Sequence, residues 1–252
     1  MPTRRSRAAA GIAFGLVVVG AGASGSAAAP ARSHAQPSVP RSSLVAYARS
    51  PVAVFSAPSA AVRPTRRLAS RTDEGLVLSF LVRSRRPGWL RVYLPTRPNG
   101  SSGWIRRSQV RVYVDAYRVR VDLDAHTLTV WKNGRTIVRD RVGVGRAVSP
   151  TPAGTYYIVS RIRPIDPNTV YGSFAFGLSA HSNVYKRFGF GGDGRIGLHG
   201  TNDAAALGHE VSHGCIRTTN RTILRLSKML PLGTPVEIVR RASSSRTHDR
   251  PH

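Results

Sequence analysis

Short runs in which apolar and polar residues alternate recur along most of this chain. The clearest are 89–94, with the sequence Trp-Leu-Arg-Val-Tyr-Leu, and 118–123, where basic and apolar residues take turns. Alternation with a period of two is typical of strands that bury one face. The pair Asn133-Gly134 lies between two such runs and predicts a hairpin with a type I′ turn. The pattern therefore predicts a mainly β protein.

The expected strands form two groups, which separate near Tyr117. The first group lies within residues 44–115, where turn residues divide the runs, and it predicts a small β-barrel. Its strands are expected at Val52–Phe55, Leu76–Val82, Trp89–Leu94 and Gly103–Ile105. The second group predicts another β-rich domain over residues 116–239. Its strands are expected at Arg118–Leu123, Thr127–Trp131, Thr136–Val142, Tyr156–Arg161, Ile196–His199 and Pro235–Val239.

Two segments of the second group depart from the strand pattern. Residues 163–194 are rich in Gly, Pro and aromatic residues, and we expect a long functional loop there. One helix is expected from about Asn220, which can cap it, to Leu230. Its apolar residues recur at helical spacing, and Pro231 and Gly233 follow to end it. The expected fold is thus two β-rich domains with one or two short helices.

The first 29 residues have the layout of a secretory signal peptide. A basic start, MPTRRSR, precedes an apolar stretch at 8–23 and a run of small residues before Pro30. Retention of this segment as an N-terminal anchor is the alternative. Residues 30–43 are rich in Pro, Ser and Ala and are expected to form a linker, and residues 240–252 a disordered tail. We therefore expect an exported protein that works in the cell envelope, the periplasm or the extracellular wall.

Composition adds a strong basic charge to this picture. The chain has 38 Lys and Arg against 12 Asp and Glu, which gives a formal charge of +26. The excess is spread over the whole chain and is not confined to one arm. Such a field attracts polyanions. Since export is expected and no array of base-stacking aromatic residues is present, anionic envelope polymers are favoured over nucleic acid as partners.

The candidate chemistry centres on the one cysteine of the chain, Cys215, which follows His213-Gly214. A second histidine, His199, lies 16 residues upstream of it. A histidine that accepts the thiol proton makes a thiolate, which attacks carbonyl carbons. Gly214 lets backbone N–H groups approach a developing oxyanion. Arg217 is placed to hold a substrate carboxylate through two parallel hydrogen bonds, and the positive end of the expected helix to help hold the thiolate.

Two other interpretations of these residues are weaker. A buried structural role does not suit Cys215, whose neighbours in this exported protein are polar residues and glycine. A zinc site built from His199, His209, His213 and Cys215 has a spacing that matches no recurrent zinc pattern. We therefore expect no bound metal and no cofactor. A single cysteine also excludes an internal disulfide.

The motifs around these residues resemble the catalytic domain of the L,D-transpeptidases, the YkuD-like family. The strings that match are IGLHGTN at 196–202, Leu207-Gly208 and SHGCIR at 212–217, with VGVG at 142–145, TPAGTY at 151–156, Tyr171-Gly172 and GTPV at 233–236. The resemblance covers roughly residues 117–239 and implies a mostly β fold.

The resemblance also implies a cysteine enzyme that acts on peptidoglycan. Enzymes of this kind cleave the bond before the terminal D-alanine of a tetrapeptide stem. They form a thioester through the diamino acid at the third position of that stem. The acyl group then passes to the side-chain amine of another stem, which crosslinks two third residues.

The roles implied by the resemblance fall on the matching positions of this chain. Cys215 is the nucleophile, His199 is the general base oriented by the Gly200 carbonyl, and His213 assists. The backbone N–H groups of Gly214 and Cys215 form the oxyanion hole. Substrate is bound by Arg217, Ser212, Tyr171 and Thr201, and residues 178–181 are expected to line the groove.

Residues 44–115 resemble a bacterial SH3-like domain in the stretch 94–100 and in Gly103-Trp104-Ile105. Such domains bind wall glycan or peptide, or serve as passive spacers. Because the candidate catalytic residues lie beyond residue 196, we expect this domain to be unnecessary for the chemistry. Two alternatives to crosslinking stay open: an L,D-carboxypeptidase that uses water as the acyl acceptor, and a non-catalytic wall-binding protein. A monomer is expected.

Overall fold

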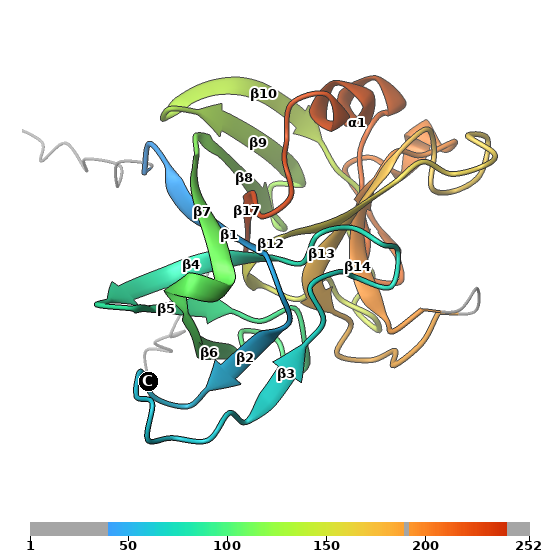
Figure 1. The fold of residues 1–252 in the computed structure, drawn as a ribbon. Helices are drawn as coiled ribbons and strands as arrows, with labels where there is room; N and C mark the ends of the chain where they lie inside the picture. The colour runs from blue at the N-terminus through green and yellow to red at the C-terminus, as the bar shows by residue number, and fades with distance from the viewer. Residues whose placement is uncertain (1–39, 189–191, 241–252) are drawn as a thin grey trace, which may run out of the picture. The chain divides into compact units, whose positions relative to one another are not determined.

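The computed structural model describes residues 40–188 and 192–240, and it confirms the mainly β fold class (Figure 1). Within these residues the chain forms two large sheets, one α-helix and two short 3-10 helices. The expected signal peptide, most of the expected linker and nearly all of the expected tail lie outside the described residues. None of the described helices has the length and apolar character needed to cross a membrane.

The N-terminal β region, residues 43–115, is a seven-stranded antiparallel sheet in the order β3-β2-β6-β5-β4-β1-β7. Its elements are β1 (Ser43–Ala48), β2 (Val52–Phe55), β3 (Arg66–Leu68), β4 (Ser79–Arg86), β5 (Trp89–Tyr93), β6 (Ser102–Arg106), η1 (Arg107–Gln109) and β7 (Val110–Asp115). The alternation at 89–94 is realised in β5, where Leu90 and Val92 are buried and the residues between them are partly exposed. These two side chains pack with Phe80 and Ile105 in a core of their own.

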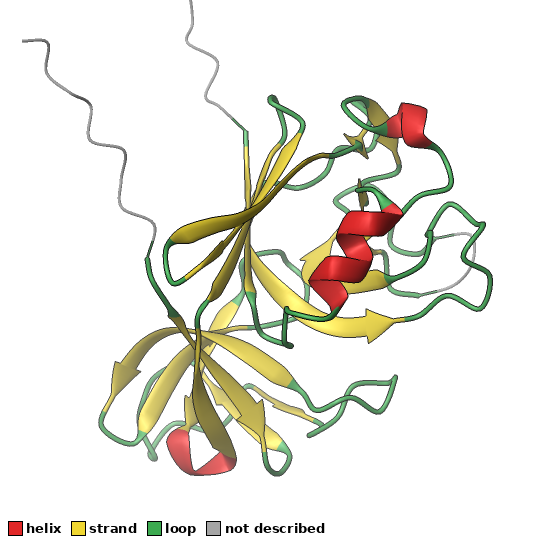
Figure 2. Cartoon of the chain, turned by 90° about the horizontal axis from the view of Figure 1, so that it is seen from above, coloured by secondary structure: helices red, strands yellow, loops and turns green. Residues whose placement is uncertain are grey.

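The C-terminal β region, residues 116–239, is built on an eight-stranded sheet in the order β10-β9-β8-β17-β12-β13-β14-β16. Its strands are β8 (Tyr117–Asp122), β9 (Thr127–Lys132), β10 (Arg135–Arg141), β12 (Gly154–Ile162), β13 (Ala175–His181), β14 (Arg195–His199), β16 (Ile216–Arg217) and β17 (Pro235–Val239). Two short parallel strands, β11 (Val144–Gly145) and β15 (Glu210–Ser212), pair apart from it, and η2 (Ala204–Ala206) lies between β14 and β15. The helix α1 (Asn220–Ser227) lies against the strands of this region (Figure 2). Its side chains Ile223 and Leu226 are buried in the core of the region.

Several expected elements are confirmed, and others differ in detail. The strand expected at Leu76–Val82 is β4, which begins at Ser79 and continues to Arg86. The hairpin at Asn133-Gly134 has positive φ angles of 52° and 80° at its two turn residues, as a type I′ turn requires. The loop expected over 163–194 in fact contains β13, a strand buried at every position. Because both of its faces are covered, this strand needs no alternation, and its small residues resemble a loop.

The helix is shorter than expected, and a different residue caps it. Thr219 is the N-cap, and its hydroxyl accepts a hydrogen bond from the Thr222 N–H at 3.1 Å. The Asn220 side chain instead accepts a hydrogen bond from the Ser173 N–H at 2.9 Å, which ties α1 to the segment before β13. The helix ends at Ser227, three residues before the expected Leu230.

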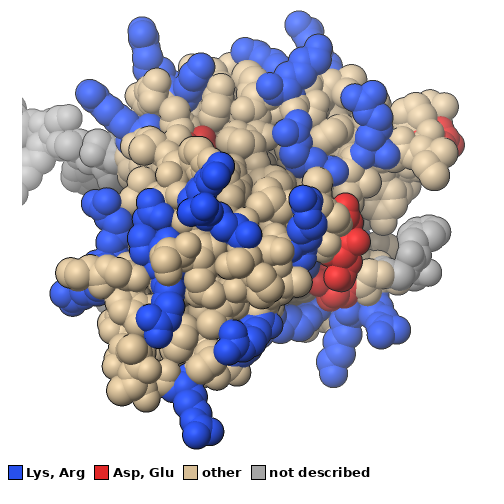
Figure 3. Space-filling model, in the orientation of Figure 1, with Lys and Arg blue, Asp and Glu red and all other residues tan. Residues whose placement is uncertain are grey.

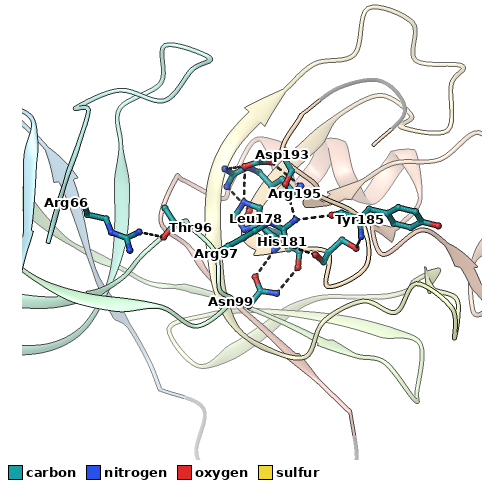
Figure 4. Close-up of polar contacts among 10 residues, drawn as sticks. Arg66, Thr96, Arg97, Asn99, Leu178, His181, Tyr185, Asp193 and Arg195 are labelled. Carbon is teal, nitrogen blue, oxygen red and sulfur yellow. Dashed lines mark hydrogen bonds and ion pairs between the residues drawn. The ribbon is translucent and has the colours of Figure 1, made fainter. Parts of the chain in front are cut away.

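The loop between β5 and β6 binds the backbone of the C-terminal β region through two side chains (Figure 4). The Asn99 amide donates to the His181 carbonyl at 2.7 Å and accepts from the His181 N–H at 2.8 Å. The Arg97 guanidinium donates to the carbonyls of Ser182, Tyr185 and Asp193 at 2.7, 3.0 and 3.1 Å. The two β regions are therefore joined by specific polar contacts as well as by the connecting chain.

We expect Asn99→Ala to lower the free energy of unfolding by about 2 kcal/mol, because it leaves the N–H and the carbonyl of buried His181 without partners. Urea unfolding of the full chain measures the change. Arg66→Ala is the matched control, since among the described residues the Arg66 side chain forms one hydrogen bond, to the half-buried Thr96 hydroxyl within the N-terminal β region. Its effect should stay within about 0.5 kcal/mol. Equal effects of the two substitutions would show that the contacts to His181 do not stabilise the chain.

Candidate active site

Cys215 lies in the tight connection between β15 and β16, which its neighbours hold in place. The Ser212 hydroxyl donates to the Cys215 carbonyl at 2.6 Å and accepts from the Gly214 N–H at 3.0 Å. The Thr151 hydroxyl donates to the Gly214 carbonyl at 2.9 Å. Gly214 has a φ of +122°, which side-chain-bearing residues rarely adopt. The connection is thus fixed before any substrate binds.

Strand pairing brings His199 to the same place. β14 and β16 are parallel neighbours, with Leu198 opposite Ile216 and His199 opposite Arg217. His199 Nδ1 lies 2.6 Å from the Gly200 carbonyl oxygen, so Nδ1 carries the proton and Nε2 is left as the acceptor. The Tyr171 ring packs on the imidazole with its centroid 5.1 Å away. His199 is only 3% exposed, and this packing fixes the orientation of its ring.

Burial shapes the protonation of both groups. The pKa of His199 is lowered to about 4, mainly by desolvation and also by the Arg217 charge, while the hydrogen bond to the Gly200 carbonyl acts to raise it. Desolvation also raises the pKa of the Cys215 thiol, while the Gly197 N–H and the Arg217 charge act to lower it. The Gly197 N–H donates to the sulfur at 3.3 Å. At neutral pH the resting pair is therefore a neutral thiol and a neutral imidazole.

The low pKa of His199 predicts the pH at which acylation of Cys215 slows on the acid side. Above pH 5, His199 is expected to stay unprotonated and able to accept a proton, because its pKa lies near 4 and not at the ordinary 6.5. As the pH falls through about 4, the ring gains a proton and acylation of Cys215 slows. The measurement is the rate of acyl-enzyme formation from pH 3.5 to 8, with circular dichroism as the control for unfolding. An acid limb near 6.5 would contradict this environment for His199.

Arg217 has surroundings that suit its expected role in substrate binding, whereas His213 already contacts another side chain. The exposed His213 ring contacts the Arg146 guanidinium, with Nε2 2.7 Å from Nη2, and packs beside Tyr185. Arg217 lines a cavity with Cys215, and its Nε is buried without a hydrogen-bond partner in the structure. A cationic guanidinium with free donors fits the expected carboxylate role, whereas His213 is engaged by a neighbouring cation.

Two expected substrate-binding side chains, Ser212 and Thr201, form hydrogen bonds within the loops of the site, and one of the two expected oxyanion donors already has a partner. The Ser212 hydroxyl is used within the connection to Cys215, and it is 2% exposed. Thr201 is buried, and its hydroxyl exchanges hydrogen bonds with the Asp203 backbone. The Gly214 N–H donates to the Ser212 hydroxyl, whereas the Cys215 N–H has no hydrogen bond to the described residues and is the available oxyanion donor of the two expected. Ser212 and Thr201 therefore support the loops of the site.

Two cavities meet at the Cys215 and His199 side chains. The first, here the Ser160 cavity, has a volume of about 370 Å³ and is lined by Glu74, Ser160, Tyr171, Gly177, Arg195, Gly197, His199 and Cys215 among others. The second, here the Arg217 cavity, is lined by Tyr171, Tyr185, Phe188, His199, His213, Cys215 and Arg217 among others. Residues 178–181 were expected to line the groove, but they are buried in β13, and the residues before them line the Ser160 cavity instead.

Sequence reasoning missed Gly197, Ser160 and Glu74. Gly197 stands inside the matched motif, but it acts through its backbone N–H, which every residue but proline has, so its residue type gave no signal. Ser160 and Glu74 reach the site only through folding, and no local pattern marks them. No group of three or more metal-binding side chains is found among residues 40–188 and 192–240.

The fold and the site define a β-rich protein with a thiol and an imidazole in shared cavities. Comparison with known proteins agrees with that description. The family model of the YkuD L,D-transpeptidase catalytic domain matches residues 116–238. YkuD of Bacillus subtilis, named an L,D-transpeptidase, is 34% identical over 128 residues, which are 51% of this chain and 69% of that protein. The chain belongs to the L,D-transpeptidase catalytic domain family.

Other similar proteins are more distant or more partial. YkuD of Bacillus licheniformis is 34% identical over 122 residues, covering 48% of this chain and 65% of that protein. This chain thus spans about two thirds of the length of these curated relatives. Among solved structures, an L,D-transpeptidase from Mycobacterium smegmatis has a TM-score of 0.39 and 16% identity, covering 60% of this chain and 89% of that one. Bd1075 of Bdellovibrio bacteriovorus has a TM-score of 0.39 and 30% identity, covering 49% and 47%.

Proposed function

We propose that this protein is a peptidoglycan L,D-transpeptidase that uses Cys215 as its nucleophile. The observation that carries the proposal is the arrangement of one thiol, one neutral imidazole and the Gly197 N–H around shared cavities. Such a set performs acyl transfer, because it supplies a nucleophile, a base and a donor that stabilises the thiolate. Family membership supports peptidoglycan stem peptides as the substrate class.

The first half of the reaction forms a thioester. His199 Nε2 accepts the thiol proton, and the thiolate attacks the carbonyl carbon of the third stem residue. The oxyanion that forms accepts a hydrogen bond from the Cys215 N–H. The bond to the terminal D-alanine then breaks, and His199 gives the proton to the departing amine. The acyl group is left on the sulfur, and D-alanine leaves with a free amino group.

The second half transfers the acyl group to an amine. The side-chain amine of another stem attacks the thioester carbonyl while His199 accepts its proton. Collapse of the intermediate forms an amide, breaks the C–S bond and returns the proton to the sulfur. Arg217 holds a carboxylate of a bound stem through its free guanidinium donors. If water takes the place of the amine, the same steps give an L,D-carboxypeptidase.

The proposal places the enzyme outside the cytoplasm, as a monomer that the N-terminal signal peptide directs to the envelope. Basic side chains cover much of the face shown in Figure 3, which supports attraction to anionic wall polymers. Binding of wall material by the N-terminal β region, with its SH3-like resemblance, forms part of the same proposal.

Mass spectrometry of purified stem tetrapeptides incubated with the enzyme tests this function. A crosslinked dimer together with free D-alanine is the expected product. A tripeptide without dimer would assign the carboxypeptidase reaction instead. Unchanged tetrapeptide, with a chain that is folded by circular dichroism, would contradict catalysis and favour a wall-binding protein.

A further inference from the structure

The N-terminal β region contributes one charged residue to the cavity that holds Cys215. Glu74 lies in a turn between β3 and β4 and lines the Ser160 cavity together with His199 and Cys215. Hydrogen bonds hold this turn, from the Thr72 N–H to the Leu76 carbonyl at 2.8 Å and from the Gly75 N–H to the Thr72 carbonyl at 2.9 Å. An active-site cavity is therefore completed by a part of the chain outside the family match.

The carboxylate of Glu74 forms no ion pair in this cavity, although Arg195 is part of the same lining. The other carboxylate of the lining, Asp193, is paired with Arg195 at 2.8 Å and with His181 at 2.9 Å. Glu74 takes part in none of the ion pairs among the described residues. Residues 41–115 carry 14 Arg and only three acidic residues, and the adjacent Asp73 is also outside the ion pairs of the described residues. Figure 3 likewise shows acidic side chains gathered mainly at one place among the basic ones.

A buried hydroxyl faces the same cavity without a partner. Ser160 on β12 is only 2% exposed, and its Oγ forms no hydrogen bond in the structure. Gly177 lies opposite it on β13, and any Cβ there would come within 2.3 Å of this oxygen. Glycine at 177 therefore leaves space beside the hydroxyl. A buried hydroxyl without a partner is costly, and a donor group bound in the cavity beside it would supply that partner.

We propose that Glu74 and Ser160 form a subsite for a ligand ammonium group, the side-chain amine of the diamino acid in the acyl-donor stem. An ammonium group has three donors and no acceptor, so a carboxylate and a hydroxyl oxygen complement it. This inference rests on the proposed function, because the third stem residue is the one whose carbonyl Cys215 attacks. It assigns the N-terminal β region a part in substrate specificity, against the expectation that the region is unnecessary for the chemistry.

Contacts between the two β regions hold together the parts of the chain that line the Ser160 cavity. Asn99 and Arg97 bind the backbone on both sides of the loop that follows β13 (Figure 4). The Tyr157 hydroxyl, from β12, donates to the Tyr93 carbonyl at 3.1 Å. Leu81 packs with Tyr157 in a buried cluster shared by the two regions. These contacts hold the two β regions together, and the Glu74 side chain itself is exposed.

Single-turnover acylation by two donors tests the subsite. One donor is a stem tetrapeptide with a free side-chain amine at its third residue, and the other carries the same amine acetylated. Glu74→Gln should raise the concentration of the free-amine donor that gives half-maximal acylation about five-fold. The same concentration for the acetylated donor should not change. Ser160→Ala should act in the same direction. Asp73→Asn is the matched control, since Asp73 is the adjacent acid and lines only a neighbouring cavity without Cys215.

If acyl-enzyme still forms, two results would overturn the subsite. Glu74→Gln would change half-maximal acylation equally for the two donors, or would change it for neither. A wild-type chain that forms no acyl-enzyme with either donor would overturn the proposed function, and this inference with it. Reaction of Cys215 with iodoacetamide should be the same in wild type, Glu74→Gln and Asp73→Asn. A change in that reaction in Glu74→Gln would assign Glu74 an effect on the thiol and contradict an effect confined to substrate.

Discussion

Replacement of Cys215 by alanine is expected to lower the rate of acyl transfer by ~10³-fold or more, since no other group of the site can carry the acyl intermediate. The sequence has no second cysteine to take its place. The loss should appear in the rate and not in folding, because the hydrogen bonds that shape the Cys215 connection use backbone atoms of Gly214 and Cys215 and the Ser212 hydroxyl.

Acylation by a carbapenem is a second measurement of the same prediction, because a thiolate attacks and opens the strained ring of the compound. Wild-type protein should gain the mass of one adduct, and Cys215→Ala should gain none. Ser212→Ala is a useful comparison, because it disturbs the connection and keeps the thiol. Full transferase activity in Cys215→Ala would remove the cysteine mechanism.

Replacement of His199 by alanine is the second large effect, expected at ~10²-fold or more in the rate of Cys215 acylation, the scale of a lost general base. The thiol pKa is raised by burial, so the sulfur needs a base to become a nucleophile at neutral pH. His199 is oriented for that task by the Gly200 carbonyl and by Tyr171. The rate should recover partly at high pH, where solvent removes the thiol proton.

His213→Ala is the matched histidine control. Its ring is exposed and contacts Arg146, so its loss should cost much less than the loss of His199 and should act mainly on substrate fit. The pH profile of Cys215 alkylation in both variants separates the roles. If His213→Ala abolishes thiol reactivity near neutral pH while His199→Ala retains it, the two roles are reversed.

Alternation in the sequence predicted those strands that have one solvent-facing side. Residues 89–94 and 118–123 correspond to β5 and β8, and Asn133-Gly134 forms the expected turn. Alternation failed for β13, whose two faces are covered by the fold. The end of α1 was missed because Pro231 and Gly233 mark where a helix must stop, and they do not exclude an earlier end at Ser227.

The site residues that lie within sequence motifs could be predicted, and those that only the fold brings together could not. Cys215, His199 and the Gly200 carbonyl lie within motifs, so their proximity and the hydrogen bond between the last two were predictable. Glu74 and Ser160 come from parts of the chain far from Cys215 in sequence. Their place in its cavity depends on strand order and on the junction of two β regions, which no local pattern encodes.

The intact mass of the full chain after brief incubation with a stem tetrapeptide tests the central claim most directly. The predicted result is an adduct equal to the tetrapeptide minus D-alanine, found by proteolysis on the peptide that contains Cys215 and absent in Cys215→Ala. Because the thioester and the free enzyme differ by the acyl group alone, the adduct identifies both the nucleophile and the bond cleaved. Turnover of the tetrapeptide without any adduct on wild type, or an adduct that persists in Cys215→Ala, would contradict the account.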